Sequence, residues 1–206
     1  MKAARRSVMI GLGVAALTAA TLQGCALLSP VNVEMTTATL DRMPQQLPHR
    51  DQHPATLLVF PPEASSVYDT TRMAYTLRPH EVAYFSRNQW GERPSQMLQT
   101  LLVSTLATTG YFSAVLTPPH TGRYTYALRV QILDLVQDFT LEPASLRLSL
   151  RLRLSDYAAD RVLATKDITL LEPMQQKTPY AGVVAANDAT AKALQEIAAF
   201  VLEHAN

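Results

Sequence analysis

Residues 144–155 read ASLRLSLRLRLS, and apolar and polar side chains alternate here without interruption. The apolar set is Ala144 followed by a leucine at every second position as far as Leu154. A two-residue period is that of a β-strand, whose successive side chains point to opposite faces, whereas a helix repeats about every 3.6 residues. We therefore expect a strand with one face buried beneath other elements and one face in water.

The segment before this strand predicts a partner strand with an irregularity. Its apolar side chains keep one phase over residues 124–132 and take the opposite phase over residues 133–139. A slip of one residue is what a β-bulge produces, so we expect a bulge near Ile132–Asp134. The bulge should keep Leu133 and Leu135 pointing inward.

The turn residues Glu142-Pro143 separate the two segments and predict an antiparallel hairpin. On its wet face, the bulge should turn Asp134 and Asp138 outward. We expect these two carboxylates to lie beside Arg147 and Arg151 of the second strand.

The rest of the chain supplies shorter strands and two helices around a proline-rich loop at 41–54. Apolar side chains repeat at helical spacing between Pro94 and Gly110, and again from about Gly182 to Glu203. The other strands that composition and turn residues predict are Val31–Leu40, Ala55–Phe60, Arg72–Leu77, Glu81–Ser86, Tyr111–Leu116 and Arg161–Leu171. The expected fold class is α+β, a single antiparallel-rich (mixed) sheet with two amphipathic helices packed on one face.

The N-terminus has the pattern of a bacterial export signal. Lys2, Arg5 and Arg6 precede an apolar stretch from Val8 to Ala20, which falls short of the roughly 20 apolar residues that a membrane-spanning helix needs. The only cysteine, Cys25, follows this stretch after four intervening residues. With no second cysteine, a disulfide within the chain is excluded.

The residues Leu22-Gln23-Gly24-Cys25 resemble the lipobox of bacterial lipoproteins. That resemblance implies cleavage before Cys25, a diacylglycerol on its thiol and an acyl chain on its new amino group. Several acyl chains hold a protein firmly to a bilayer without a membrane-spanning helix. By the sorting pattern of enterobacterial lipoproteins, Ala26, which is not Asp, favours the periplasmic face of the outer membrane over the inner membrane. The expected organisation is a signal peptide (1–24), a lipidated N-terminus with a short tether (25–30) and one domain (31–206).

Charge and motifs exclude several classes of function. Without the leader, 15 basic and 17 acidic side chains remain, too balanced a charge to recruit nucleic acid. His49 and His53 lie among prolines rather than on a helix, so we expect no metal site there. No catalytic or nucleotide-binding motif is present, and we expect neither an enzyme nor a cofactor besides the lipid on Cys25.

Two features stay open between a structural and a binding role. Arg147, Arg151 and Arg153 form either an ordinary wet sheet face or a docking face for a partner protein or lipid phosphates. Trp90, close to two other aromatic side chains, is either a core residue or an interface anchor.

An ordered set of motifs then carries a family resemblance. The stretches are LLVFPP, YDTTRMAY, VAYFSRNQW, RPSQML and TTGYFSAVL, between residues 55 and 116. Together with the lipobox, they resemble the auxiliary lipoproteins of ABC-type transport systems, the group that includes paraquat-inducible protein C. Arg72, Tyr75, Trp90 and Pro94 map onto this pattern. Arg72, Tyr75 and Trp90 are candidate partner contacts, although the resemblance leaves open whether these residues bind a partner or only hold the fold.

The resemblance implies a docking or structural component without catalysis. Its expected partners are a periplasmic protein with an MCE (mammalian cell entry) domain and the permease and ATPase of the same ABC system. Such a system is expected to move phospholipid or other hydrophobic molecules between the inner and outer membranes, and a homo-oligomer is compatible with that role. The alternatives are a free-standing envelope structural or assembly lipoprotein, which would stand apart from permease and ATPase genes, and an envelope hydrolase.

Overall fold

The computed structural model describes residues 34–205, so the expected leader, the tether and the lipidation site at Cys25 lie outside the described residues. Residues 35–206 make up one body. Its elements are β1 (Thr36–Ala38), β2 (His53–Val59), β3 (Glu63–Ala64), β4 (Arg72–Thr76), β5 (Ala83–Trp90), α2 (Pro94–Thr108), β6 (Phe112–Leu116), β7 (Tyr126–Asp138), β8 (Ser145–Asp156), β9 (Arg161–Pro173) and α3 (Pro179–His204).

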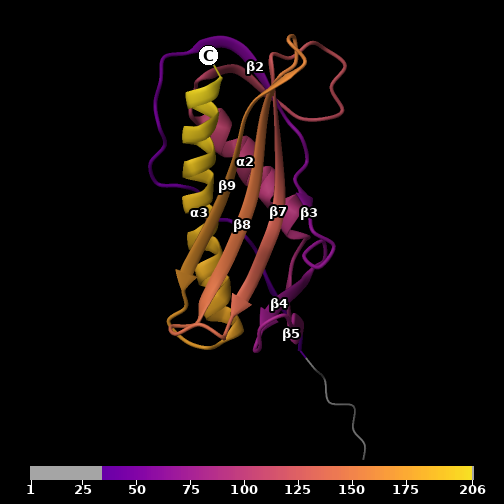
Figure 1. The fold of residues 1–206 in the computed structure, drawn as a ribbon, viewed down its shortest axis with the longest axis vertical. Coiled ribbons are helices and arrows are strands. Elements are labelled where there is room, and N and C mark those ends of the chain that lie inside the picture. The colour runs from indigo at the N-terminus through magenta and orange to yellow at the C-terminus, as the bar shows by residue number, and fades with distance from the viewer. Residues whose placement is uncertain (1–33, 206) are drawn as a thin grey trace, which may run out of the picture. The chain divides into compact units, whose positions relative to one another are not determined.

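The nine strands of the described residues form one mixed sheet around β7. β8 pairs antiparallel with one edge of β7, and β9 pairs antiparallel with β8. Along the other edge of β7, β2, β3 and β4 pair in succession, all of them parallel to it. β6 extends the sheet beyond β2, and β5 and then β1 extend it beyond β4. The long strands β7, β8 and β9 therefore lie side by side with β9 at one edge of the sheet, and the shorter strands make up the rest (Figure 1).

The predicted bulge is confirmed between β7 and β8. Ile132 pairs with Leu150 and Asp134 with Ser149, so Leu133 has no partner. Leu135 is buried as expected. Leu133 is not: as the extra residue of the bulge, it is only half-buried and stays outside the core cluster, so its inward prediction is wrong.

The outward prediction for Asp138 is also wrong, because its side chain is only 5 % exposed. Asp138 accepts hydrogen bonds from the hydroxyl and backbone N–H of Thr140 and from Arg147. Tyr68 covers Val136 at this end of the strand. A face that alternation alone predicts to be wet is thus covered here by a loop distant in sequence.

Both helices pack on the same face of the sheet, as predicted, and β7, β8 and β9 cross in front of α2 in Figure 1. The leucines of β8 from Leu146 to Leu154 are at most 3 % exposed, and they share one apolar cluster with residues of α2 and α3. The burial of these leucines, which the alternating pattern predicts, stabilises the fold by removing apolar surface from water. The opposite face of β7, β8 and β9, which carries the arginines, is hereafter called the open face.

Local signals account for the helix ends. Pro94 occupies the first turn of α2, where its missing N–H costs no hydrogen bond. Gly110 follows the helix with a φ of +66°, a conformation that favours glycine. At the start of α3, Thr178 accepts a hydrogen bond from the Ala181 N–H. A Cβ on Gly182 would lie 2.0 Å from Gln137, so glycine permits the close approach of α3 to β7.

The N-terminal part of the body is less regular than predicted. The expected strand Val31–Leu40 is only Thr36–Ala38 among the described residues. The loop that follows is held to α3 by Asn187, whose amide oxygen accepts hydrogen bonds from the N–H groups of Asp41 and Arg42. Its amide nitrogen donates to the Thr39 carbonyl, so one side chain satisfies three backbone groups of the loop.

Candidate functional site

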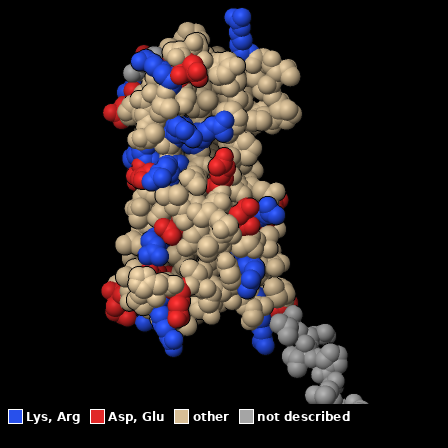
Figure 2. All heavy atoms as spheres, turned by 45° about the vertical axis from the view of Figure 1, so that its right-hand side comes forward, with Lys and Arg blue, Asp and Glu red and all other residues tan. Residues whose placement is uncertain are grey.

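The open face carries four arginines on two neighbouring strands. Arg129 comes from β7, and Arg147, Arg151 and Arg153 come from β8. Figure 2 shows basic and acidic side chains interspersed over one side of the molecule, with several basic ones close together in its upper half. The position of the acidic partners therefore decides which arginines remain available to a ligand.

Arg147 belongs to a network of internal contacts. Its guanidinium lies 3.1 Å from the Asp138 carboxylate and 3.9 Å from the Asp134 carboxylate. The Tyr68 hydroxyl donates to Asp134 at 3.1 Å, and burial, together with the neighbouring Asp134, raises the pKa of Tyr68 to about 12. The expected proximity of Asp134 and Asp138 to Arg147 is confirmed, and it commits Arg147 to the fold.

Arg151 does not contact these carboxylates, in contrast to the prediction. It lies opposite Gln131 on β7 and opposite Asp167 on β9. Its Nε and Nη2 donate to the two oxygens of Asp167 at 2.9 and 2.8 Å. This bidentate pair raises the pKa of Arg151 and lowers the pKa of Asp167. The partner, Asp167, lies on β9. The sequence predicted this strand but not its register against β8.

Arg129 and Arg153 differ from the other two. They face each other across β7 and β8, and neither forms an ion pair with any side chain in residues 34–205. The Arg129 guanidinium lies 3.8 Å from the centre of the Phe60 ring, which orients it by a cation–π contact. Like charges opposite each other destabilise a sheet. An anion bound between them would relieve that repulsion.

A shallow hollow of about 260 Å³ lies at these two arginines. Gln131, Thr165 and the paired Arg151 also line it, and Glu63 is its one acidic lining residue among the described part of the chain. Planar guanidinium groups recognise carboxylates and phosphates by paired hydrogen bonds. The open face at Arg129 and Arg153 is therefore the candidate docking site.

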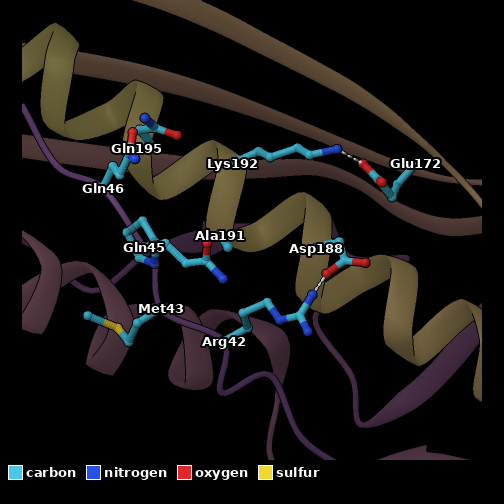
Figure 3. Close-up of a pocket in the computed structure, with 10 residues that line it drawn as sticks. Arg42, Met43, Gln45, Gln46, Glu172, Asp188, Ala191, Lys192 and Gln195 are labelled. Atoms are coloured by element: carbon cyan, nitrogen blue, oxygen red, sulfur yellow. Dashed lines mark hydrogen bonds and ion pairs between the residues drawn. The ribbon is translucent and has the colours of Figure 1, made fainter.

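A larger groove of about 540 Å³ lies between residues 42–46 and α3 (Figure 3). Its charged side chains already pair across it: Arg42 with Asp188, and Lys192 with Glu172 at 2.5 Å. Glutamines supply much of the remaining lining. Because each cation in this groove has its own anion, the groove is a weaker candidate than the hollow on the open face.

The other predicted contact residues lie on β4 and β5, away from this hollow. The Arg72 guanidinium lies 4.0 Å from the centre of the Tyr84 ring, and the rings of Tyr75 and Phe85 are 4.4 Å apart. Trp90 is 3 % exposed and belongs to the core cluster, so it has almost no surface to offer a partner. Its burial therefore favours a role as a core residue over a role as an interface anchor.

Sequence reasoning missed Arg129 and Phe60. Arg129 interrupts the apolar residues Leu128 and Val130, and this alternation is the signal that would have placed it on the wet face. Phe60 follows a strand on the other side of β7 and carries no comparable signal.

Two wider searches complete the description of the site. In residues 34–205, no group of three or more His, Cys, Asp or Glu side chains is arranged to hold a metal ion. None of the described helices is both long enough and apolar enough to cross a membrane.

The fold is similar to that of solved bacterial proteins. Protein XCC0632 from Xanthomonas campestris, of the family DUF330, has a TM-score of 0.73 at 20 % identity, over 83 % of this chain and 96 % of that one. The hypothetical protein CT253 from Chlamydia trachomatis has a TM-score of 0.51 at 10 % identity, over 75 % and 100 %. At these identities the likeness establishes the fold alone. None of the curated proteins matches the sequence.

A family model described as the ABC-type transport auxiliary lipoprotein component matches residues 39–198. The match includes β2 to β9, α2 and most of α3, and hence both the open face and the helix-covered face. It agrees with the resemblance carried by the motifs between residues 55 and 116. The chain therefore belongs to the family of ABC-type transport auxiliary lipoprotein components.

Proposed function

We propose that this protein is a membrane-anchored periplasmic accessory lipoprotein of an ABC transport system that moves phospholipid or other hydrophobic molecules between the inner and outer membranes. The family match over residues 39–198 is the observation that carries the proposal. The export signal and Cys25 agree with it, because they would place an acylated N-terminus on the periplasmic side of a membrane. Ala26 favours the outer membrane.

The proposed role is docking without catalysis. Acyl chains exposed to water cost about 0.8 kcal/mol per CH₂, so a system that moves lipid across the periplasm needs a shielded path. An anchored domain can hold the end of such a path, and anchoring raises its effective concentration near a partner, so modest contacts suffice.

The contact that we propose is between the open face and an acidic surface of the periplasmic MCE-domain protein. Arg129 and Arg153 have no acidic partner among the described residues, and Phe60 holds one of them in place. Charge complementarity of this kind selects the partner and speeds the encounter. Lipid phosphates offer similar chemistry, and competition by anionic lipid would identify them as the ligand instead.

Crosslinking in the native host tests the proposal. The full-length protein is purified from crosslinked membranes, and the bound proteins are identified by mass spectrometry. We expect the MCE-domain protein, the permease or the ATPase to be recovered with wild-type protein, and recovery to fall with Cys25→Ala, which removes the anchor. Repeated recovery of no transport component from wild-type membranes would overturn the proposal.

A further inference from the structure

The end of the body at the β4–β5 connection exposes apolar side chains. Leu77 is 65 % exposed and Val82 43 %, and they flank the connection between β4 and β5. Tyr180, in the first turn of α3, is 74 % exposed. Exposed apolar side chains that gather at one place on a soluble body indicate a contact surface.

The sheet brings these three side chains to the same end. β4 pairs with the last residues of β7, so that Tyr75 lies opposite Gln137. The Gln137 amide donates to the Pro179 carbonyl at 3.2 Å, which places the start of α3 beside the same strand end. The β4–β5 connection and the first turn of α3 therefore lie together at the end of the body where β4 and β5 appear in Figure 1.

The described chain begins near this end. Thr36 in β1 pairs with Asn88 in β5, the strand that leads out of the connection at residues 77–82. Nine residues lie between Cys25 and Met35, and the ten Cα–Cα steps from one to the other span at most about 35 Å when fully extended. Reaching a bilayer from the opposite end, where β8 turns into β9, would need most of that length, since β7 and β8 are themselves roughly 40 Å long. The end with Leu77 needs only a fraction of it.

We propose that the end of the body formed by Leu77, Val82 and Tyr180 rests on the lipid bilayer that holds Cys25, with these side chains in its interfacial layer. This inference rests on the proposed lipid anchor. The charged residues near these side chains pair with one another, Arg78 with Glu81 and Lys177 with Glu142. Contact therefore depends on apolar burial and not on anionic headgroups, and vesicles of neutral phosphatidylcholine suffice to show it.

Fluorescence quenching by lipid tests the inference on the full-length, host-processed protein in phosphatidylcholine vesicles. Cys25 is the only cysteine, so once it is acylated an introduced cysteine is the only free thiol. An environment-sensitive dye is placed at Leu77→Cys, at Tyr180→Cys or, as the matched control, at Tyr157→Cys. Tyr157 is 57 % exposed and follows the end of β8 at the opposite end of the sheet. All three sites are exposed, and circular dichroism checks that each variant is folded.

We expect nitroxide-labelled lipids to quench most of the emission at positions 77 and 180 and to leave that at position 157 almost unchanged. Equal, weak quenching at all three positions in an acylated protein would overturn the bilayer contact and leave the proposed function intact. Reaction of the dye with the unsubstituted, host-processed protein would show a free Cys25 thiol. That outcome removes the anchor, and both the contact and the proposed membrane attachment fail with it.

Discussion

The two faces of β8 are built from the same twelve residues and have opposite chemistry. On the covered face, leucines at every second position are almost completely buried against the helices. The arginines that alternate with these leucines lie on the open face and are of two kinds. Arg147 and Arg151 pair with carboxylates of the same chain, whereas Arg153 faces Arg129. The covered face is thus committed to stability, and only part of the open face is free for recognition.

The largest effect should come from the covered face. Leu150→Ala removes a fully buried side chain from the centre of the core, and we expect it to lower the free energy of unfolding by about 2–5 kcal/mol. Urea denaturation followed by circular dichroism measures the change. Arg153→Ala, on the other face of the same strand, is the matched control and should leave the midpoint nearly unchanged. A similar loss in both variants would contradict the division between the faces.

Within the open face, the buried end should matter more for stability than the exposed middle. Asp138→Ala leaves Arg147 with the more distant Asp134 and removes the acceptor of Thr140, so we expect a loss of about 1–3 kcal/mol. Asp167→Ala breaks the exposed pair with Arg151, and its effect should be much smaller. The same denaturation experiment compares the two, and a larger loss in Asp167→Ala would reverse our ranking.

The alternation of residues 144–155 and the phase slip near residue 133 predicted the strand, its buried leucines and the bulge correctly. Both are local signals, because side-chain direction in a strand depends only on position along it. The burial of Asp138 was not predictable in this way. It depends on β4, which places Thr76 opposite Asp138, and nearby Tyr68 meets Asp134 across 66 positions of sequence. Such a contact exists only once β4 has paired with β7.

The candidate site was predicted only in part for the same reason. The sequence placed Arg147, Arg151 and Arg153 on one face but not the acids opposite them. Which arginine finds a partner depends on strand register, which the bulge in β7 and the pairing with β9 decide together. The register between β7 and β8 places Arg129 opposite Arg153. Phe60 follows β2, which pairs with the other edge of β7, and its ring contacts Arg129.

The Tyr68 network provides a pH test of the buried end. Burial and Asp134 raise the pKa of Tyr68 from 10.0 to about 12. Between these two values, the unfolded chain has lost this proton and the folded chain keeps it, so the free energy of unfolding should fall as pH rises through this window. Burial also raises the pKa of Tyr126, which adds to the same trend. Tyr68→Phe should weaken the pH dependence, measured by denaturation from pH 9 to pH 12.

The exposed Tyr157→Phe is the matched control for this measurement, since it removes a hydroxyl from the surface. An unchanged pH dependence in Tyr68→Phe would mean that folding does not raise the pKa of Tyr68, which would contradict its burial beside Asp134.

The smallest effect on stability should come from Arg129→Ala and Arg153→Ala, because neither arginine has an ion-pair partner to lose within residues 34–205. Because the charge repulsion between them is removed, we expect the denaturation midpoint to stay the same or to rise slightly. A marked loss of stability in the double variant would show that these arginines support the fold, as Arg147 does.

The most direct test of the account measures recovery of the transport partner with the same double variant in crosslinked native membranes. The matched control is Arg87→Ala with Arg161→Ala. It removes two exposed arginines outside the hollow and has the same net charge as the Arg129/Arg153 variant. We predict that the Arg129/Arg153 variant is folded and membrane-bound but recovers about tenfold less MCE-domain protein than wild type, a loss of the size expected for charge-assisted hydrogen bonds. Undiminished recovery with the Arg129/Arg153 variant, or an equal loss with the control, would contradict the claim that the unpaired part of the open face binds the partner.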